Sequence, residues 1–229
     1  MTHTFDKDYW QHHWDDRTSN TVAANPYLVE ETAGLTPGTV LDAGCGTGAE
    51  AIWLAERDWQ VTGADISAAA LDAAAKQAES ARVDVTWIEA DLTSWNPTER
   101  WDLVMTHYAH PSIPQLDFYR HIAQWVAPGG SLLIVGHLHD GAQHHSHEGA
   151  PPHEATVTTK DITALFDASS WRIDTALERS RTVGGIGVHS KTLRDAVVRV
   201  TRTTPYTRPA ASLGIPKSLS KAVLRDKNY

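Results

Sequence analysis

The chain is poor in several features that would mark other classes of protein. Its 229 residues include one cysteine, Cys45, so an internal disulfide is excluded. No segment approaches the roughly 20 apolar residues that a membrane-spanning helix requires. Residues 1–6 contain no basic segment followed by an apolar one, so they do not resemble a secretion signal. These absences predict a protein of the cytoplasm that does not enter a membrane.

The chain also lacks an excess of positive charge. Its 20 Lys and Arg residues stand against 28 Asp and Glu residues, for a net charge of −8, so a non-specific polyanion such as nucleic acid is a poor partner. The length suits one α/β domain with a sizeable core. We expect this domain to span residues 1–203, with 1–34 as an N-terminal helical cover and 204–229 as a tail.

The rest of the chain is organised around one stretch that is rich in glycine. The apolar run 39–43 predicts a short buried parallel strand, and Gly44, Gly46 and Gly48 follow it at alternate positions. The segment 49–57 then has apolar side chains at the spacing of one helix face. Strand, glycine turn and helix in this order are typical of the nucleotide-binding start of a doubly wound sheet.

The ligand of this glycine turn has to be chosen between two classes. Gly44-x-Gly46-x-x-Ala49 satisfies the loose dinucleotide fingerprint, so NAD is considered. Asp42 argues against NAD, because the strand before a dinucleotide loop is usually apolar up to its first glycine. A carboxylate at this point suits a ligand with a cationic end, such as the ammonium of a methionine moiety.

Further strands and helices follow in alternation. Strands are predicted at 60–64, ending at Asp65, and at 84–90, ending at Asp91. An acidic residue about twenty positions after the first glycine accepts hydrogen bonds from ribose hydroxyls in a doubly wound fold, which predicts that role for Asp65. Ser67 is the predicted N-cap of a helix at 68–80. A fourth strand is expected at 101–106, a helix at about 115–126, and a fifth strand at 131–136 after Pro128-Gly129-Gly130.

The C-terminal part predicts an edge to the sheet. Residues 137–152 read as a polar loop, and Thr159 as the cap of a helix at 160–167. Strands at 171–177 and 193–200 suit an antiparallel hairpin joined by the glycine-rich loop 183–189. The predicted fold is α/β: a doubly wound, Rossmann-like, seven-stranded and mostly parallel sheet with an antiparallel edge hairpin and helices on both faces.

Two helices are expected before the first strand. In residues 5–16, Tyr9, Trp10 and Trp14 can share one helical face, which predicts a helix docked by its aromatics, a flap over a bound ligand, or both. Asn25-Pro26 opens a second helix, with Tyr27, Leu28 and Val29 expected to face inward.

Asp42-x-Gly44-x-Gly46-x-Gly48, Asp65, Asp91 and the Pro-Gly-Gly turn, in this order, resemble class I S-adenosylmethionine (SAM) methyltransferases. The runs 25–31 and 46–55, with Tyr9-Trp10, are similar to a narrower group of small bacterial methyltransferases, described as tellurite-resistance-like or thiopurine-methyltransferase-like. The resemblance implies SAM as cofactor and in-line transfer of its methyl group to a small molecule. That acceptor is a thiol, a hydroxyl, a ring nitrogen or a chalcogen oxyanion derivative.

The resemblance also implies site residues. An acidic residue at the end of the third strand receives the adenine amine in this family, which matches Asp91, and the N–H of Leu92 is placed to meet a ring nitrogen. The implied cofactor-binding residues are Tyr9, Trp10, Trp14, Asp42, Gly44, Cys45, Gly46, Gly48, Asp65, Ile66, Asp91, Leu92 and Thr106. The acceptor is expected at the end of the fourth strand, where His107 is the best-placed base, followed by His110 and His137. A thiolate or selenide acceptor needs no base.

Other functions remain as alternatives at this point. An NAD oxidoreductase is disfavoured by Asp42, and a DNA amino-methyltransferase by the absence of a Pro-Pro-aromatic motif after the fourth strand. A metal-binding or metal-responsive protein on a SAM-binding scaffold is the stronger alternative, because the stretch from His137 onward supplies enough imidazoles for zinc, nickel or copper. The histidine spacing matches no established motif, so no metal ligand is assigned. The oligomeric state stays open.

Overall fold

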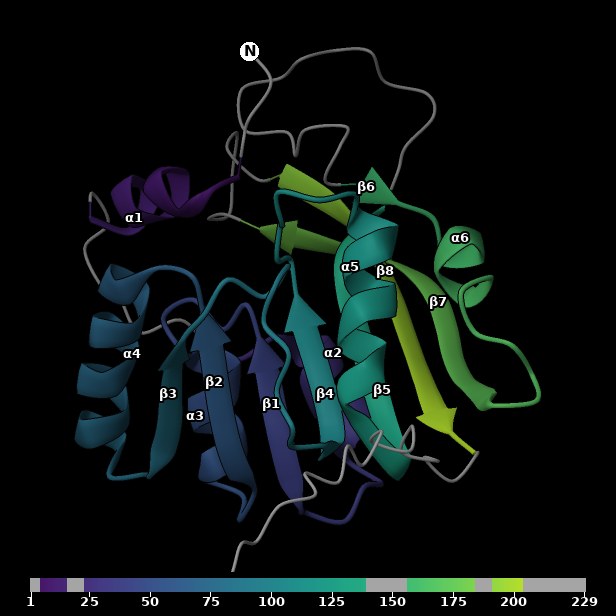
Figure 1. The fold of residues 1–229 in the computed structure, drawn as a ribbon, viewed down its shortest axis with the longest axis horizontal. Helices are drawn as coiled ribbons and strands as arrows, with labels where there is room; N and C mark the ends of the chain where they lie inside the picture. Colours follow the sequence, from purple (N-terminus) through teal and green to yellow (C-terminus); the bar gives the residue numbers. More distant parts are fainter. Residues whose placement is uncertain (1–4, 16–22, 139–155, 184–190, 204–229) are drawn as a thin grey trace, which may run out of the picture.

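The computed structural model describes residues 5–15, 23–138, 156–183 and 191–203. Their strands form one sheet in the order β3-β2-β1-β4-β5-β8-β7, with β6 paired to β5 (Figure 1). The strands are β1 (Thr39–Ala43), β2 (Gln60–Asp65), β3 (Val85–Glu89), β4 (Trp101–His107), β5 (Val126–Leu138), β6 (Thr156–Val157), β7 (Trp171–Val183) and β8 (Lys191–Arg202). All pairings are parallel except those of β8 with β5 and β7. The predicted doubly wound sheet with an antiparallel edge hairpin is therefore confirmed, and the two-residue strand β6 is an addition.

Helices cover both faces of this sheet, as predicted (Figure 1). They are α1 (Lys7–Asp15), α2 (Pro26–Thr32), α3 (Ala49–Ala55), α4 (Ala68–Ala81), α5 (Gln115–Ile122) and α6 (Thr159–Thr163), with a 3₁₀ turn η1 (Ala123–Trp125) after α5. Buried side chains of α2 and α3 pack on one face of the sheet, and those of α5 and α6 pack on the other. Among the helices that the structure describes, none is long and apolar enough to cross a membrane.

The alternation of side chains along each strand decides which residues reach the site. Leu103 and Met105 of β4 pack in the cluster of α2 and α3, whereas Val104 packs in the cluster of α5 and α6. Because successive side chains point to opposite faces, His107 belongs to the α2/α3 face and Thr106 to the other. The same alternation assigns Asp42 of β1, His137 of β5 and Asp195 of β8 to the α2/α3 face. These side chains share one face near the carboxyl ends of β1, β4 and β5.

The fifth strand is longer than predicted. It begins at Val126, which pairs with Trp101, and it runs through the Pro-Gly-Gly turn to Leu138. The register shifts between Trp101 and Leu103, and Gly129 has a φ of +79°, so the turn is a bulge within the strand and not its start. The preceding helix consequently ends at Ile122. The expectation that His137 opens a loop is wrong, because this residue pairs within β5 with β6 and β8.

Local predictions were corrected at two helices and confirmed at a third. The Ser67 hydroxyl caps α4 by accepting from Ala70 N, as expected. The cap of α6 is Thr158 and not Thr159, and the helix ends at Thr163. On α2 the side chain of Val29 is exposed. Thr32, one turn after Leu28, takes the inward position, and its hydroxyl donates to Leu28 O. The predicted histidine-rich loop, the connection of the β7–β8 hairpin and the C-terminal tail lie largely or wholly outside the described residues.

Candidate active site

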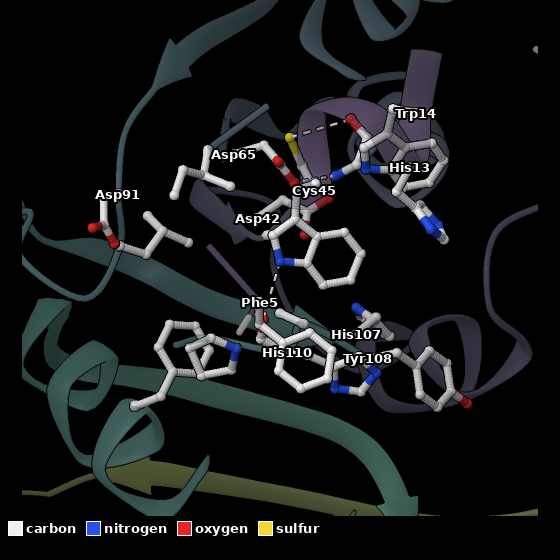
Figure 2. Close-up of a pocket in the computed structure, with 18 of the residues that line it drawn as sticks. Phe5, His13, Trp14, Asp42, Cys45, Asp65, Asp91, His107, Tyr108 and His110 are labelled. Carbon is white, nitrogen blue, oxygen red and sulfur yellow. Dashed lines mark hydrogen bonds between the residues drawn. The ribbon is translucent and has the colours of Figure 1, made fainter. Parts of the chain in front are cut away.

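A cavity of about 720 Å³ opens where the carboxyl ends of β1, β2 and β4 meet α1 (Figure 2). This position is the crevice in which doubly wound sheets bind their ligands. Figure 2 shows Asp42, Cys45 and Asp65 along one side of the cavity and His107, Tyr108 and His110 along the other. Of the predicted site residues, the cavity wall includes Tyr9, Trp10, Trp14, Asp42, Gly44, Cys45, Gly46, Asp65, Ile66, Asp91, Leu92, His107 and His110.

The glycine turn is shaped by close neighbours on both sides. Gly44 has a φ of +83°, and a Cβ there would lie 2.6 Å from the Cβ of Ala109. Gly46 has a φ of +50°, and its Cβ would lie 3.1 Å from the Trp14 ring. The turn is therefore held between the segment after β4 and helix α1, and side chains on it would fill the approach to its backbone.

Asp65 braces this turn from the end of β2. One carboxylate oxygen, Oδ2, accepts from Gly46 N at 2.9 Å, and the other accepts from Ser67 N at 2.9 Å. The pKa of Asp65 is raised by burial, and these backbone donors offset only part of the rise. A carboxylate has about four acceptor positions, so two remain for hydroxyl groups of a ligand. The brace and the predicted ribose contact are thus compatible.

Asp42 is a buried acidic group with one carboxylate oxygen unpaired among the described residues. It is 2% exposed, and its Oδ2 has no hydrogen-bond partner among the described residues. Burial, followed by the nearby carboxylates Glu50 and Asp65, raises its pKa well above the usual value. A buried carboxylate with one unpaired oxygen at a cavity favours a cationic group of a ligand.

Asp91 lies at the edge of the cavity beyond β3. Its Oδ1 accepts from both the backbone N–H and the hydroxyl of Thr93, so one oxygen shapes the local turn. Leu92, the next residue, is buried, and both Leu92 and Ile66 line the cavity. Because Oδ1 of Asp91 caps the turn, Oδ2 remains for the predicted contact to an adenine amine.

Helix α1 closes the cavity with aromatic rings. Trp10 Nε1 donates to the carbonyl of His110 at 3.3 Å, and the rings of Phe5 and Trp10 both lie within about 6 Å of the His110 ring. Gln11 Oε1 accepts from Ser67 Oγ and from Ala69 N at the start of α4. Helix α1 is therefore docked on the domain by its aromatic side chains, and the same side chains line the cavity.

The three candidate histidines differ in environment. Neither ring nitrogen of His107 has a partner among the described residues, and burial lowers the pKa of His107. Burial, and then the nearby His137, lower the pKa of His110 to about 4. His137 lies just behind the cavity wall, with its ring centroid 4.6 Å from that of Tyr108 and 5.5 Å from that of His110.

Three predicted site residues do not line the cavity: Gly48, Thr106 and His137. A Cβ on Gly48 would lie 2.6 Å from the Trp87 ring, so this glycine permits packing of the turn on β3. Thr106 points to the other face of the sheet. Several lining residues were not predicted as site residues, and of these Glu50, directly after the glycine turn, had the clearest signal: Phe5, His13, Thr47, Ala49, Glu50, Thr93, Ala109, Pro111, Ser112 and Phe118.

Two further features bear on the chemistry of the site. In the described part of the chain there is no group of three or more potential metal-ligating side chains. Cys45 is buried in the turn, and burial raises the pKa of its thiol well above the usual value, which disfavours a nucleophilic role. The glycine turn, the buried carboxylate of Asp42 and the Asp65 brace at the end of β2 form the arrangement expected of a class I methyltransferase fold, and these residues fit SAM.

Comparison with known proteins finds similarity to methyltransferases. Residues 40–130 match the model of a methyltransferase domain. The chain is 26% identical over 169 residues to thiocyanate methyltransferase 1 of Brassica oleracea, covering 69% of this chain and 72% of the relative. It is 30% identical over 149 residues to trans-aconitate 2-methyltransferase of Azoarcus sp. (strain BH72), covering 62% of this chain and 57% of the relative.

A solved structure shares the fold. The N-methyltransferase NodS from Bradyrhizobium japonicum WM9, in complex with S-adenosyl-L-homocysteine (SAH), superposes with a TM-score of 0.64 at 14% identity, over 88% of this chain and 100% of that chain. This chain carries a methyltransferase domain of the class I fold, and it is a SAM-dependent methyltransferase.

Proposed function

We propose that this methyltransferase acts on a small, soft, anionic nucleophile, of which thiocyanate and a thiolate are the simplest examples. The observation that carries the proposal is the chemistry of the acceptor side. Around the end of β4 the wall is rich in aromatic rings and imidazoles, and none of the described residues that line the cavity is Lys or Arg. The similarity to a thiocyanate methyltransferase supports this acceptor class. A cytoplasmic location belongs to the same proposal.

A polycarboxylate acceptor fits this wall less well. Carboxylates carry localised, strongly hydrated charge and are recognised in proteins by Arg, Lys or backbone donors. The wall near His107 and His110 offers neutral rings, while Asp42 and Glu50 on the cofactor side would repel a carboxylate. A soft anion spreads its charge over a larger group and loses less hydration free energy on entering such a compartment.

The histidines favour an acceptor that arrives without a proton to lose. A general base works best when its pKa lies near the working pH. The pKa of His110 is about 4, and the pKa of His107 is also lowered. Both imidazoles are therefore neutral but weakly basic at neutral pH. This arrangement suits a sulfur anion better than a hydroxyl or phenol acceptor.

The protein's own contribution is then positioning and exclusion of water. Asp42, the glycine turn and Asp65 would hold the cofactor, and the rings of α1 cover it. Bound SAM would supply the methyl group: the acceptor's sulfur lone pair would form the new bond to the methyl carbon as the methyl–sulfonium bond breaks, and the electron pair of that bond would remain on SAH. His107, the last residue of β4 and part of the cavity wall, would line the path of the acceptor.

The test is a panel of acceptors at saturating SAM, with SAH formation as the readout. Thiocyanate and a small thiol should be turned over faster than a phenol or trans-aconitate. The rate on thiocyanate should stay flat from about pH 6 to pH 8, and His107→Gln should remain within a few-fold of wild type. His121→Gln, on α5 and away from the cavity wall, is the matched control.

Two outcomes would overturn the proposal. Preferred turnover of trans-aconitate would show that carboxylates are accepted despite the wall. A rate limb near pH 6–7 that disappears in His107→Gln, with kcat lower by roughly 10²–10⁴, would establish His107 as a base and a proton-bearing acceptor.

A further inference from the structure

Asp195 on β8 is a fully buried carboxylate beside the acceptor end of the cavity. It is 0% exposed, and its Oδ2 accepts from Arg181 Nε of β7 at 2.8 Å. Its other oxygen, Oδ1, lies 3.9 Å from His137 Nδ1, directly across the β5–β8 pairing. A carboxylate buried between a guanidinium and an imidazole loses hydration free energy, which these partners have to offset.

The same guanidinium holds Tyr108. Arg181 Nε donates to Tyr108 Oη at 3.2 Å as well as to Asp195, and Arg181 Cζ lies 5.0 Å from the centroid of the Tyr108 ring. Asn25, the N-cap of α2, donates to the same phenol oxygen at 3.3 Å. Two segments far apart in the sequence, β7 and the start of α2, therefore meet at the phenol oxygen of Tyr108.

Tyr108 has an unusual backbone. Its φ is +54°, in the left-handed region that aromatic residues rarely adopt. Such conformations persist only when the surroundings over-determine them. Here the constraints are the two donors to the phenol oxygen, the neighbouring His137 ring, and the bond from Tyr108 N to Val135 O at 2.9 Å.

The turn at Tyr108 sets the position of Ala109 and His110, which line the cavity. Directly after it, Ala109 lies against Gly44 of the glycine turn, and the carbonyl of His110 accepts from Trp10 of α1. Gln115 Nε2 donates to the carbonyl of Ala109 at 2.9 Å. A small change at Tyr108 would therefore shift Ala109 and His110, which line the cavity at its acceptor end.

We infer that Asp195 is the positioning residue of the acceptor end: through Arg181 it holds Tyr108 in its left-handed turn and thereby places residues 108–110 against the glycine turn. The inference rests on the proposed function in taking the end of β4 as the acceptor's place. It adds a buried ion pair on the β7–β8 hairpin to the machinery that aligns the acceptor.

The first test does not depend on activity. In Asp195→Asn, hydrogen exchange of the amides of residues 108–110 should accelerate by about 10-fold or more, while the amides of residues 42–48 stay unchanged. Arg181→Met should give the same local pattern, and Arg181→Lys, which keeps the charge, should recover part of the protection. Glu178→Gln, on the exposed part of β7, is the control and should leave both segments unchanged.

Unchanged exchange at residues 108–110, or equal acceleration in both segments, would overturn the inference, because the latter is what a general loss of stability produces. If Asp195→Asn fails to fold, the double variant Asp195→Asn with Arg181→Met removes both charges and leaves neither uncompensated. It should fold and show the same selective acceleration.

The second test uses turnover of thiocyanate. Asp195→Asn should lower kcat by about 10- to 100-fold, as expected for a displaced reactant, with the SAH dissociation constant within about twofold of wild type. An equal loss in SAH affinity would contradict an acceptor-side role. If wild type turns over none of the acceptors tested, the proposed function fails, and the exchange pattern still decides the inference about Asp195.

Discussion

The burial of His110 links the site to the stability of the protein. The pKa of His110 is about 4 in the folded protein, against about 6.5 in an unfolded chain, because burial and the nearby His137 disfavour its charged form. The unfolded chain therefore binds a proton first as the pH falls. Stability associated with this group is complete above about pH 6.5 and is lost progressively between about pH 6.5 and pH 4.

This linkage predicts a measurable difference for His110→Leu. Between about pH 7.5 and pH 5 the wild type should lose about 2 kcal/mol more of its free energy of unfolding than the variant does, measured by urea titration at each pH. Equal pH dependence of wild type and His110→Leu would show that His110 titrates as an ordinary exposed histidine.

Helix α1 shows how a short element can be both packing and cover. Its contacts to the body of the domain include the pair of bonds that Gln11 accepts from Ser67 and Ala69, and the bond from Trp10 to the carbonyl of His110. The ring of Trp14 lies against Gly46 of the glycine turn. Because the same rings line the cavity, binding of a ligand there should also hold the helix in place.

We predict that SAH slows proteolysis near residues 15–25 in the wild type and protects much less in Gln11→Ala. Gln11 on α1 accepts hydrogen bonds from Ser67 and Ala69 at the start of α4, and the variant removes this acceptor while leaving the cavity wall intact. The loss should lower the stability of the docked helix α1 by about 1 kcal/mol. Limited proteolysis with and without SAH measures this, with Lys76→Ala on the exposed face of α4 as the control. Equal cleavage of the wild type in both conditions would leave α1 as plain packing.

The helices and strands of this fold were predictable because their signals are local. The run before Gly44, the cap at Ser67 and the alternation after Trp171 each depend on a few neighbouring residues. The start of β5 was not predictable in this way, because it depends on pairing of Val126 with Trp101 of another strand. Val29 was placed inward for the same reason: its exposure depends on the angle at which α2 meets the sheet.

The cofactor side of the site follows from topology and motif, whereas the acceptor side does not. Asp42, Asp65 and Asp91 each follow or end a parallel strand, and such ends meet at one edge of a doubly wound sheet. Ranking the three histidines required burial and partners that only the packed structure supplies. Arg181 and Asp195 carry no local signal at all, since their role arises from the register of β7 against β8 and of β8 against β5.

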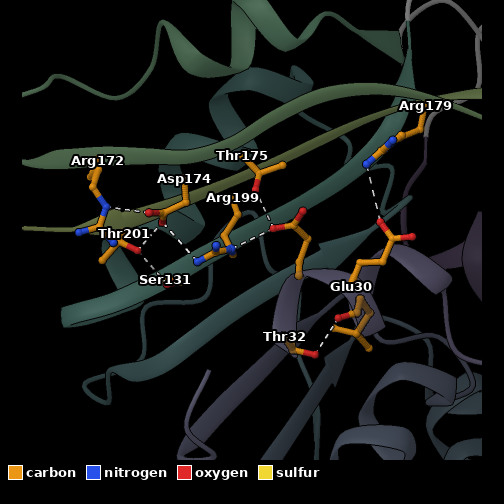
Figure 3. Close-up of polar contacts among 11 residues, drawn as sticks. Glu30, Thr32, Ser131, Arg172, Asp174, Thr175, Arg179, Arg199 and Thr201 are labelled. Carbon is orange, nitrogen blue, oxygen red and sulfur yellow. Dashed lines mark hydrogen bonds and ion pairs between the residues drawn. The ribbon is translucent and has the colours of Figure 1, made fainter. Parts of the chain in front are cut away.

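The connection between α2 and the edge hairpin holds together parts of the chain that are far apart in sequence. Arg199 Nε lies 2.9 Å from Glu31 Oε2, and Arg199 Nη1 lies 3.4 Å from Asp174 Oδ2 (Figure 3). Thr175 Oγ1 donates to the same oxygen of Glu31. The side chains of Glu31 and Arg199 are 12% and 19% exposed, so solvent screens this pair only in part.

Breaking this pair should therefore cost more than breaking an exposed pair of the same hairpin. In Glu31→Gln, Arg199 loses the nearer of its two charged partners in a largely buried place, which should lower the free energy of unfolding by about 2–3 kcal/mol. Glu178→Gln removes one partner of Arg194, and because both side chains are about half exposed its cost should be at most about 1 kcal/mol. Urea titration of both variants at neutral pH measures the difference. A double-mutant cycle of Glu31→Gln with Arg199→Met should give a coupling free energy of at least about 1 kcal/mol. If Glu31→Gln costs no more than Glu178→Gln, α2 is held on the sheet by its apolar face alone.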